Sequence, residues 1–190
     1  MKKPLASMLL CLISIAGVFS QSLNTVRVGG VAETISLPFQ FNDPLKGGLE
    51  LSTDLWYREK EKSIRQINLS FMAFFREGVN NNYYLLGSYE HQFFLGHSLA
   101  LSLEGGLGYV HTFFAGTAYR LENGTYASTR FASKPGVAAR LGAGFYLRRQ
   151  KAVQPYISYG WMLDYTFPPI FPPVTPHSIL QIGLRVSIHP

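Results

Sequence analysis

Residues 97–114 alternate between two kinds of side chain. The apolar set is Leu99, Leu101, Leu103, Leu107 and Tyr109, with Gly105 among them, and the other set is Ser98, Ala100, Ser102, Glu104, Gly106 and Gly108. Successive side chains of a strand point to opposite faces, so this period of two predicts a β-strand with one apolar face and one small, polar face. The small face holds no lysine, which is unusual for a surface in bulk water but ordinary inside a transmembrane barrel.

The same alternation recurs along the chain, with no helical period between the segments. We predict further strands at residues 48–58, 63–76, 83–94, 136–148, 153–167 and 177–188. The first strand is the least clear and falls within residues 25–41, where Gly29, Gly30 and Pro38 interrupt the alternation. The sequence therefore predicts an all-β fold, an eight-stranded antiparallel up-and-down β-barrel.

The predicted connections differ in length. Those after the second, fourth and sixth strands are short. Residues 115–135 are predicted to be a long polar loop, and the proline-rich residues 168–176 a stiff loop that cannot pair as a strand. Membrane barrels have short turns on the periplasmic side and longer loops outside. With both chain ends in the periplasm, every long connection falls on the outer side.

A soluble barrel would show the same alternation with its apolar face inside, and three observations favour a membrane barrel instead. The predicted second to eighth strands contain no lysine. The lysines of this part of the chain all fall in the predicted connections: Lys46, Lys60, Lys62, Lys134 and Lys151. The charges on the small face nearly cancel. Aromatic residues recur near the ends of the apolar face, as in an interfacial girdle: Tyr57, Phe75, Tyr83, Phe93, Tyr109, Phe113 and Tyr165.

The charged residues of the small face are expected to point into the barrel lumen and to form a network there. They are Glu50, Asp54, Arg58, Arg76, Glu90, Glu104, Arg140, Arg148, Asp164 and Arg185. Eight strands leave an interior barely wide enough for its own side chains, which favours a structural plug over a path for a solute. A buried charge needs a partner, and Glu104 and Arg140 are the simplest pair, with Arg185 or Arg76 as substitutes.

The first twenty residues have the pattern of a secretory signal. Lys2 and Lys3 form a basic start, residues 9–18 an apolar core, and cleavage is expected near Ser20 or Gln21. We therefore expect a signal peptide at residues 1–20 and a barrel domain at residues 21–190. The single cysteine, Cys11, lies in the apolar core, so the mature chain would have neither disulfide nor thiolate zinc site.

Several motifs suggest chemistry that their spacing does not support. A lipid-A deacylase would need His-x-Ser on one face of a strand, but His97-Ser98 and His177-Ser178 are adjacent and so point to opposite faces. His189 follows Ser187 at the required spacing, but at the end of the chain. His91 and His111 fall on the apolar face near strand ends and are interpreted as interfacial residues, not metal ligands.

The signal, the eight alternating segments, the asymmetry of the connections and residues 180–188, Leu-Gln-Ile-Gly-Leu-Arg-Val-Ser-Ile, resemble the small outer-membrane barrels of Gram-negative bacteria, of the OmpX and OmpA-transmembrane type. The resemblance covers nearly all of the mature chain and implies a bacterial outer-membrane location. It also implies insertion by the barrel-assembly machinery. Such chains often end on an aromatic residue, whereas this one ends on Pro190.

The primary hypothesis is a non-enzymatic, monomeric barrel without cofactor or metal, whose outer loops act in surface interaction or envelope support. Its expected partners are outer-membrane lipid and lipopolysaccharide. Two interpretations stand for Arg120, Arg130 and Lys134, namely contact with the phosphates of lipopolysaccharide and ordinary solvated loop charge. The formal net charge of +6 falls to +4 when Lys2 and Lys3 leave with the signal. Nucleic acid is a poor alternative for an exported chain without a dense basic stripe. The alternatives are a lipid-modifying enzyme and a narrow, porin-like pore.

Overall fold

The computed structural model describes residues 24–35, 45–76, 80–114, 118–122, 125–129, 133–148, 152–167 and 174–188. These residues form ten strands and no helix. The strands are β1 (Thr25–Ile35), β2 (Lys46–Lys60), β3 (Ser63–Arg76), β4 (Asn80–Leu95), β5 (Leu99–Phe114), β6 (Ala118–Glu122), β7 (Thr125–Thr129), β8 (Ser133–Leu147), β9 (Val153–Thr166) and β10 (Val174–Ser187).

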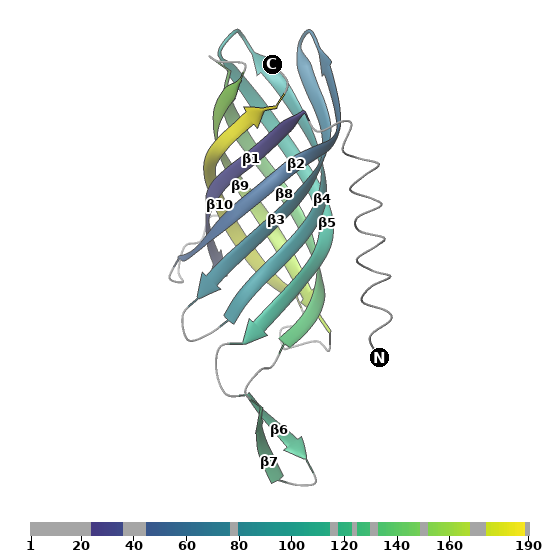
Figure 1. The fold of residues 1–190 in the computed structure, drawn as a ribbon, viewed down its shortest axis with the longest axis vertical. Helices are drawn as coiled ribbons and strands as arrows, with labels where there is room; N and C mark the ends of the chain where they lie inside the picture. Colours follow the sequence, from purple (N-terminus) through teal and green to yellow (C-terminus); the bar gives the residue numbers. More distant parts are fainter. Residues whose placement is uncertain are drawn as a thin grey trace.

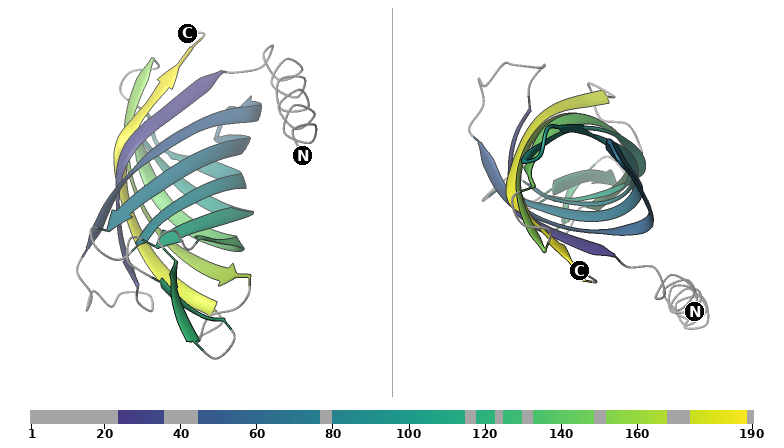
Figure 2. Two further views of the ribbon diagram at one scale, coloured as in Figure 1. Left: turned by 60° about the horizontal axis from the view of Figure 1, so that its bottom comes forward. Right: turned by 90° about the horizontal axis from the view of Figure 1, so that it is seen from above.

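Eight of the strands close into a barrel in the order β1-β10-β9-β8-β5-β4-β3-β2. Each neighbouring pair is antiparallel, and β1 closes the barrel against β10, with Thr25 opposite Ser187 and Ile35 opposite His177. The strands are strongly tilted in Figure 1, and the view from above in Figure 2 shows the closed ring. A closed barrel has no edge strand, so each backbone can pair on both sides. The predicted eight-stranded antiparallel barrel is confirmed.

The two ends of the barrel are built differently. At the turn end, where β1 begins and β10 ends, β2 connects to β3 through Glu61 and Lys62, and β4 connects to β5 through residues 96–98. Gly96 has a φ of 77° in this second turn, a conformation that favours glycine. The opposite end is called the hairpin end, because β6 and β7 project beyond the barrel there (Figure 1).

The prediction of one long polar loop over residues 115–135 is wrong in two respects. β6 and β7 pair as an antiparallel hairpin, with Ala118 opposite Thr129 and Glu122 opposite Thr125. Residues 133–135 already belong to β8, where Pro135 lies opposite His111 of β5. Ladder pairing therefore continues beyond the segment in which side chains alternate, and the alternation alone placed the strand boundary too late.

The same extension corrects the placement of three lysines. Lys46 and Lys60 are the first and last residues of β2, and Lys134 is the second residue of β8. The prediction that these lysines lie in connections is wrong, although each lies at the end of its strand. A terminal position lets the ammonium group of Lys60 stay in water, whereas Lys46 is buried inside the barrel.

Three prolines also lie within strands. Pro135, Pro155 and Pro176 are the third residues of β8, β9 and β10, respectively. Proline lacks an N–H donor and is tolerated best near the start of a strand. The prediction that residues 168–176 cannot pair is wrong for the last three of them, because Val174, Thr175 and Pro176 pair with β9.

The burial of side chains is inverted with respect to a soluble barrel. Large apolar side chains cover the outside, with Leu107 71% and Leu49 64% exposed. Charged and amide side chains fill the inside, where Glu90, Gln66 and Gln92 are 0% exposed. This arrangement agrees with the predicted faces on most strands, and it places an apolar belt around the whole barrel.

One strand reverses its faces partway along. The register between β2 and β3 shifts between Asp54 and Trp56, so Leu55 is the extra residue of a β-bulge. Beyond the bulge Trp56 points outward, 41% exposed, and Arg58 is exposed opposite Arg65. The predictions that Tyr57 lies on the apolar face and that Arg58 joins the lumen charges are therefore wrong. The physical reason is that one inserted residue moves every later side chain to the other face.

Candidate functional site

The lumen contains a central cluster of charged and amide side chains to which all eight barrel strands contribute. Its members are Arg27 (β1), Glu50 (β2), Gln66 and Asn68 (β3), Glu90 and Gln92 (β4), Glu104 (β5), Arg140 and Tyr146 (β8), Tyr156 (β9), and Gln181 and Arg185 (β10). Three arginines face three glutamates, so the formal charges of the cluster cancel. Cancellation matters because a buried charge without a partner is costly.

Glu90 is the most heavily bonded carboxylate of the central cluster. Its Oε2 accepts hydrogen bonds from Arg27 Nη1 at 2.9 Å, Gln66 Nε2 at 2.7 Å and Asn68 Nδ2 at 3.0 Å. Its Oε1 accepts from Gln92 Nε2 at 3.0 Å. These four donors, one on β1, two on β3 and one on β4, replace the water that this carboxylate loses on burial.

Two glutamine side chains connect a third arginine to the same carboxylate. Arg185 donates from Nη2 to Gln66 Oε1 at 2.9 Å and from Nη1 to Gln92 Oε1 at 3.2 Å. Because the amide nitrogens of both glutamines donate to Glu90, each amide relays the interaction between cation and anion. The guanidinium carbon of Arg185 also lies 5.6 Å from the ring centroid of Tyr57, which points inward beyond the bulge.

The other half of the central cluster is organised around Arg140. Its Nη2 donates to Gln181 Oε1 at 2.6 Å and lies 3.3 Å from Glu104 Oε2, the partner expected from the sequence. Its Nη1 lies 3.5 Å from Glu50 Oε1. Gln181 Nε2 donates to Glu50 Oε2 at 2.7 Å, so a glutamine again connects an arginine to a glutamate.

Arg27 joins the two halves. Besides Glu90, it donates from Nη1 to the hydroxyl of Tyr146 at 2.9 Å, and its Nη2 lies 3.9 Å from Glu104 Oε1. The Tyr146 ring stacks on that of Tyr156, with centroids 5.3 Å apart, and the Tyr156 hydroxyl donates to Glu50 Oε2 at 3.3 Å. The central cluster is therefore one connected network across the lumen.

An apolar layer lies next to the central cluster on its hairpin-end side. It consists of Val31, Met72, Phe74, Tyr84, Leu86, Val110, Ala138, Met162 and Ile179. The order along β10 shows the layering, since the inward positions run from Gln181 through Ile179 to His177. A water-filled channel would leave such side chains exposed, but Met72, Tyr84, Met162 and Ile179 are 0% exposed.

A second polar group, the hairpin-end cluster, lies beyond the apolar layer. It consists of Glu33, Lys46, Tyr84, Asp164 and His177. The His177 ring lies between two carboxylates, with Nδ1 in contact with Glu33 and Nε2 3.1 Å from Asp164 Oδ2. Lys46 Nζ lies 3.8 Å from Glu33 Oε1, and the Tyr84 hydroxyl donates to Asp164 Oδ2 at 2.7 Å.

Most of the ten predicted lumen charges lie inside the barrel. Glu50, Glu90, Glu104, Arg140 and Arg185 belong to the central cluster, and Asp164 belongs to the hairpin-end cluster. Asp54 is buried at the turn end, where its Oδ1 accepts from the backbone N–H of Thr25 at 2.6 Å.

Three predicted charges stand apart from these clusters. Arg148 lies at the turn-end rim, 3.5 Å from Glu59 and with its guanidinium carbon 3.3 Å from the ring centroid of Phe94. Arg58 is outside the lumen, as described above. The side chain of Arg76 lies outside the described part of the structure.

Four charged or titratable residues of the lumen were missed in the sequence. Arg27 and Glu33 lie on β1, for which no faces were assigned, although Val26 and Val28 flank Arg27 with apolar side chains. Lys46 falls in a predicted connection, and His177 stands at the first position of its predicted strand. Alternation continued to both ends of each strand places all four residues on the inner face.

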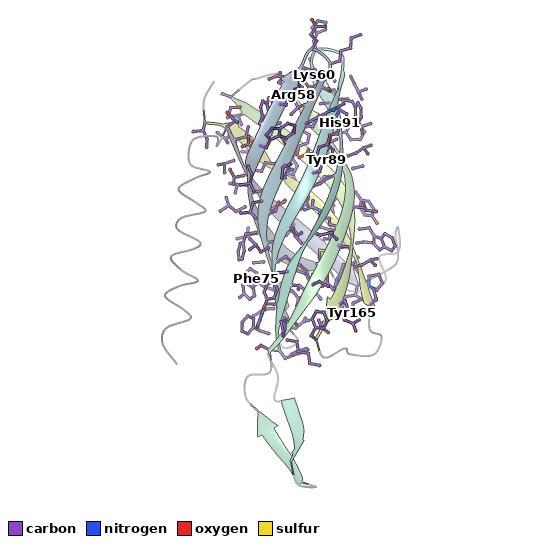
Figure 3. The ribbon with its side chains drawn as sticks, turned by 90° about the vertical axis from the view of Figure 1, so that its right-hand side faces the viewer. Arg58, Lys60, Phe75, Tyr89, His91 and Tyr165 are labelled. Carbon is purple, nitrogen blue, oxygen red and sulfur yellow. The ribbon has the colours of Figure 1, made fainter. Side chains whose placement is uncertain are left out.

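The outer face carries aromatic and basic side chains near its ends. Figure 3 shows Phe75 and Tyr165 towards the hairpin end, and Arg58 and Lys60 at the turn end. Tyr83 packs edge-on against Phe75 and Phe113, with ring centroids 6.3 Å and 5.6 Å apart. His91 and His111 lie on this face, as predicted, and His111 Nδ1 is 2.5 Å from the Tyr109 hydroxyl.

The adjacent residues His177 and Ser178 lie on opposite faces of β10, as predicted. His177 faces the lumen and Ser178 the outside, where Ser178 Oγ accepts from the Tyr159 hydroxyl at 3.0 Å. Across the described ranges no group of three or more histidine, cysteine, aspartate or glutamate side chains is arranged to hold a metal ion. None of the described segments is a helix long and apolar enough to cross a membrane. His189 lies outside the described residues.

No protein-family model matches the chain, and no curated protein matches it by sequence. Solved structures match its fold. The chain is similar to Neisserial surface protein A, NspA, with a TM-score of 0.60 and 10% identity over 86% of this chain and 96% of NspA. It is also similar to the outer membrane enzyme PagL, with a TM-score of 0.50 and 14% identity over 86% of this chain and 99% of PagL. The fold is that of the small eight-stranded outer-membrane β-barrels, as the sequence resemblance predicted.

Proposed function

We propose that this protein is a non-enzymatic, non-conducting bacterial outer-membrane barrel that presents the segments at its hairpin end for interaction at the cell surface. The observation that carries the proposal is the central cluster, a charge-balanced network bonded across the lumen and enclosed by an apolar outer face. Such a barrel is a rigid, closed support, and its functional variation falls to the connections it holds.

The outer face supports the membrane location. Apolar side chains on every barrel strand are about half exposed, including Val28, Leu51, Ile67, Leu103 and Ile182. A soluble monomer rarely exposes a continuous apolar surface larger than about 600 Å². A belt around the whole barrel therefore needs an apolar solvent, and the closed ladder satisfies the backbone there.

The interior supports the absence of conduction. The apolar layer and the central cluster lie one above the other, and Met72 Sδ of the layer lies 3.7 Å from both Arg140 Nη1 and Gln181 Nε2 of the cluster. An ion would have to displace bonded arginine and glutamate side chains and then pass a dry layer. Both steps are unfavourable in a lumen of eight strands.

The connections at the hairpin end support the role in surface interaction. The connection from β5 to β8 contains β6 and β7, which extend past the barrel rim (Figure 1). With the chain ends in the periplasm, this hairpin would face the outside of the cell. The proposal includes export through the N-terminal segment, insertion by the barrel-assembly machinery, a monomeric state, and contact of Arg120, Arg130 and Lys134 with lipopolysaccharide.

Three measurements on the detergent-extracted, refolded protein test the proposal. Unboiled protein should migrate differently from boiled protein in gels, because a closed barrel resists detergent until it is heated. In planar bilayers it should give no conductance steps. In mixed vesicles of phospholipid and lipopolysaccharide it should release no fatty acid from either lipid.

The expected results for conductance and for fatty-acid release each exclude one alternative function. Stable conductance steps would establish the narrow pore, and fatty-acid release would establish the lipid-modifying enzyme. Orientation is tested on intact cells with a protease site inserted between Glu122 and Thr125. Cleavage from outside is expected, and protection in intact cells combined with cleavage after lysis would reverse the proposed orientation.

A further inference from the structure

Three basic side chains lie side by side on the outer face near the turn end. Arg58 of β2 is paired in register with Arg65 of β3, and Arg65 is paired with His91 of β4. Both arginines are exposed. Figure 3 shows Arg58 and His91 on this face, with Lys60 at the end of β2. Arg58, Arg65 and His91 are called the basic row.

The β-bulge at Leu55 creates the basic row. Without the extra residue Arg58 would point into the lumen, whereas with it Arg58 shares the outer face with Arg65. Residues directly opposite each other in an antiparallel pair have Cβ atoms about 5 Å apart, and like charges at such positions are destabilising. An anion between the two guanidinium groups would remove this repulsion.

No described acidic side chain forms an ion pair with the basic row. Glu59, the acidic residue next to Arg58 in sequence, lies 3.5 Å from Arg148. Glu61 is exposed in the turn between β2 and β3. Within the described ranges, neither Arg58 nor Arg65 has an ion-pair partner. The row therefore carries unbalanced positive charge, which attracts anionic lipid headgroups at a membrane surface.

The outer face next to the basic row is amphipathic and then apolar. Trp56, Ile67 and Tyr89 are paired across the same three strands, two residues nearer to the hairpin end, and all three are exposed. Tryptophan and tyrosine favour the level of the lipid headgroups. Further along β2 and β3 lies a groove of about 270 Å³, whose lining includes the exposed side chains of Leu51 and Leu69. The order from the turn end is therefore cation, interfacial ring and hydrocarbon, which matches the parts of a phospholipid.

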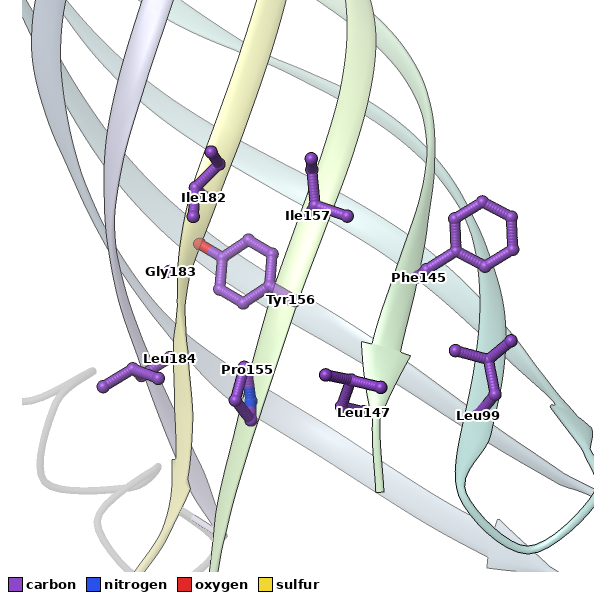
Figure 4. A pocket seen from close by; sticks show the side chains of 9 residues that line it. All are labelled: Leu99, Phe145, Leu147, Pro155, Tyr156, Ile157, Ile182, Gly183 and Leu184. Carbon is purple, nitrogen blue, oxygen red and sulfur yellow. The ribbon is translucent and has the colours of Figure 1, made fainter. Parts of the chain in front are cut away.

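A larger groove in another part of the apolar belt lacks the basic complement. It has a volume of about 560 Å³, lies between β5, β8, β9 and β10, and has Ile157 among its lining residues (Figure 4). None of the described residues that line it is charged. Arg148, directly after β8, contacts Glu59 and the Phe94 ring. Apolar surface alone does not select one lipid headgroup, so this groove serves as the comparison for the basic row.

We propose that the basic row binds the phosphate of an anionic glycerophospholipid in the periplasmic leaflet, with one acyl chain lying along β2 and β3 past Trp56 and Ile67. Arg58 and Arg65 donate to the phosphate oxygens, because a guanidinium group matches phosphate in bidentate geometry. A zwitterionic headgroup brings its own cation to the row and binds less tightly. The leaflet rests on the proposed function, which places the turn end in the periplasm.

The first test removes the charge of the basic row. Arg58→Gln/Arg65→Gln is compared with Lys60→Gln/Lys62→Gln, which removes the same charge from exposed positions at the β2–β3 turn. The proteins are refolded in phosphatidylcholine vesicles that contain one tenth phosphatidylglycerol, extracted gently, and analysed by native mass spectrometry. Wild type and the lysine variant should retain phosphatidylglycerol at least fivefold above its share of the lipid. The arginine variant should retain the two lipids in proportion to their supply.

An undiminished preference for phosphatidylglycerol in the arginine variant would overturn the proposal. Equal loss in the arginine and lysine variants would also overturn it, because net charge alone would then explain the preference. In pure phosphatidylcholine the arginine variant should unfold at the same urea concentration as wild type, since both charges are exposed. Heat-modifiable migration is measured on the same samples. A wild type that inserts normally but shows no lipid preference refutes the basic row and leaves the proposed function intact.

A second measurement locates the lipid on the outer face. A bimane fluorophore is attached to Ile67→Cys beside the basic row or to Ile157→Cys in the larger groove, with Cys11 replaced by serine. Quenching by brominated phosphatidylglycerol is divided by quenching by the same fraction of brominated phosphatidylcholine, so that the depth of the label cancels. This ratio should be at least twofold higher at Ile67→Cys, and the difference should vanish with Arg58→Gln/Arg65→Gln. Equal ratios at the two positions would show only random belt lipid and would overturn the proposal.

Discussion

The lumen holds two polar groups that solve the burial of charge in different ways. In the central cluster, amide side chains separate and connect the ions, so that Glu90 accepts bonds from Gln66, Asn68 and Gln92 as well as from Arg27. In the hairpin-end cluster, charged groups contact one another directly, with His177 between Glu33 and Asp164. The apolar layer separates the two groups.

The difference lies in how each group reaches neutrality. The three arginines and three glutamates of the central cluster balance without a titrating residue. In the hairpin-end cluster, Lys46 and His177 balance Glu33 and Asp164 only when His177 carries a proton. The central cluster therefore has the fixed charge balance expected of a structural plug, while the charge balance of the hairpin-end cluster depends on the protonation of His177.

Glu90→Gln should have the largest effect. It removes the anion that neutralises Arg27 and converts one of the two acceptor oxygens into a donor, which then faces either Gln92 or the three donors on Oε2. Breaking a buried ion pair from one side costs about 3–5 kcal/mol. The free energy of unfolding, measured by urea titration in vesicles, should fall by that amount. A loss below about 1 kcal/mol, the size of one ordinary hydrogen bond, would show that water reaches the central cluster.

A double-mutant cycle of Glu104→Gln and Arg140→Gln should give the next largest effect. Each single change leaves a buried charge behind, so the double variant should be more stable than the sum of the two losses predicts. Coupling of about 1–3 kcal/mol is expected for residues within one network. Additive losses together with channel conductance would mean a wet lumen and would replace the plug by a pore.

His177→Gln should have a smaller effect than Glu90→Gln. Glutamine keeps one donor for Glu33 or Asp164 but leaves two carboxylates with Lys46 as the cation. The loss of one hydrogen bond to a charged group corresponds to about 1.5–3 kcal/mol, and the hairpin-end position should place the result at the lower end of that range. His177→Gln and Glu90→Gln are compared in the same urea titration. Equal losses would erase the contrast between the two clusters.

Arg58→Gln should have the smallest effect. The bulge at Leu55 places Arg58 on the exposed face, so the change should alter the free energy of unfolding by no more than about 0.5 kcal/mol. Arg185→Gln is the matched comparison, since that guanidinium donates to Gln66 and Gln92 inside the lumen. If the two variants lost equal stability, the reversal of faces at the bulge would be wrong.

The sequence by itself determined the barrel and the inner face of most strands. A period of two sets which residues of a strand share a face. The burial of Glu50, Glu90, Glu104 and Arg140 follows because each lies on the small, polar face of its strand. The absence of a helical period excluded crossover helices. These features are local, so they survive without knowledge of the neighbouring strands.

Only the tertiary structure decided where each strand ends, where the faces reverse and which charges meet. Arg58 left the lumen through one extra residue in β2, and Lys46 entered it because β2 pairs with β1 and β3 beyond its alternating segment. Arg27 and Glu90 are 63 residues apart and meet across the lumen. Strand register and barrel shear set the position of each side chain along the barrel axis. Both arise from pairing between strands, and the spacing within a single strand does not encode that pairing.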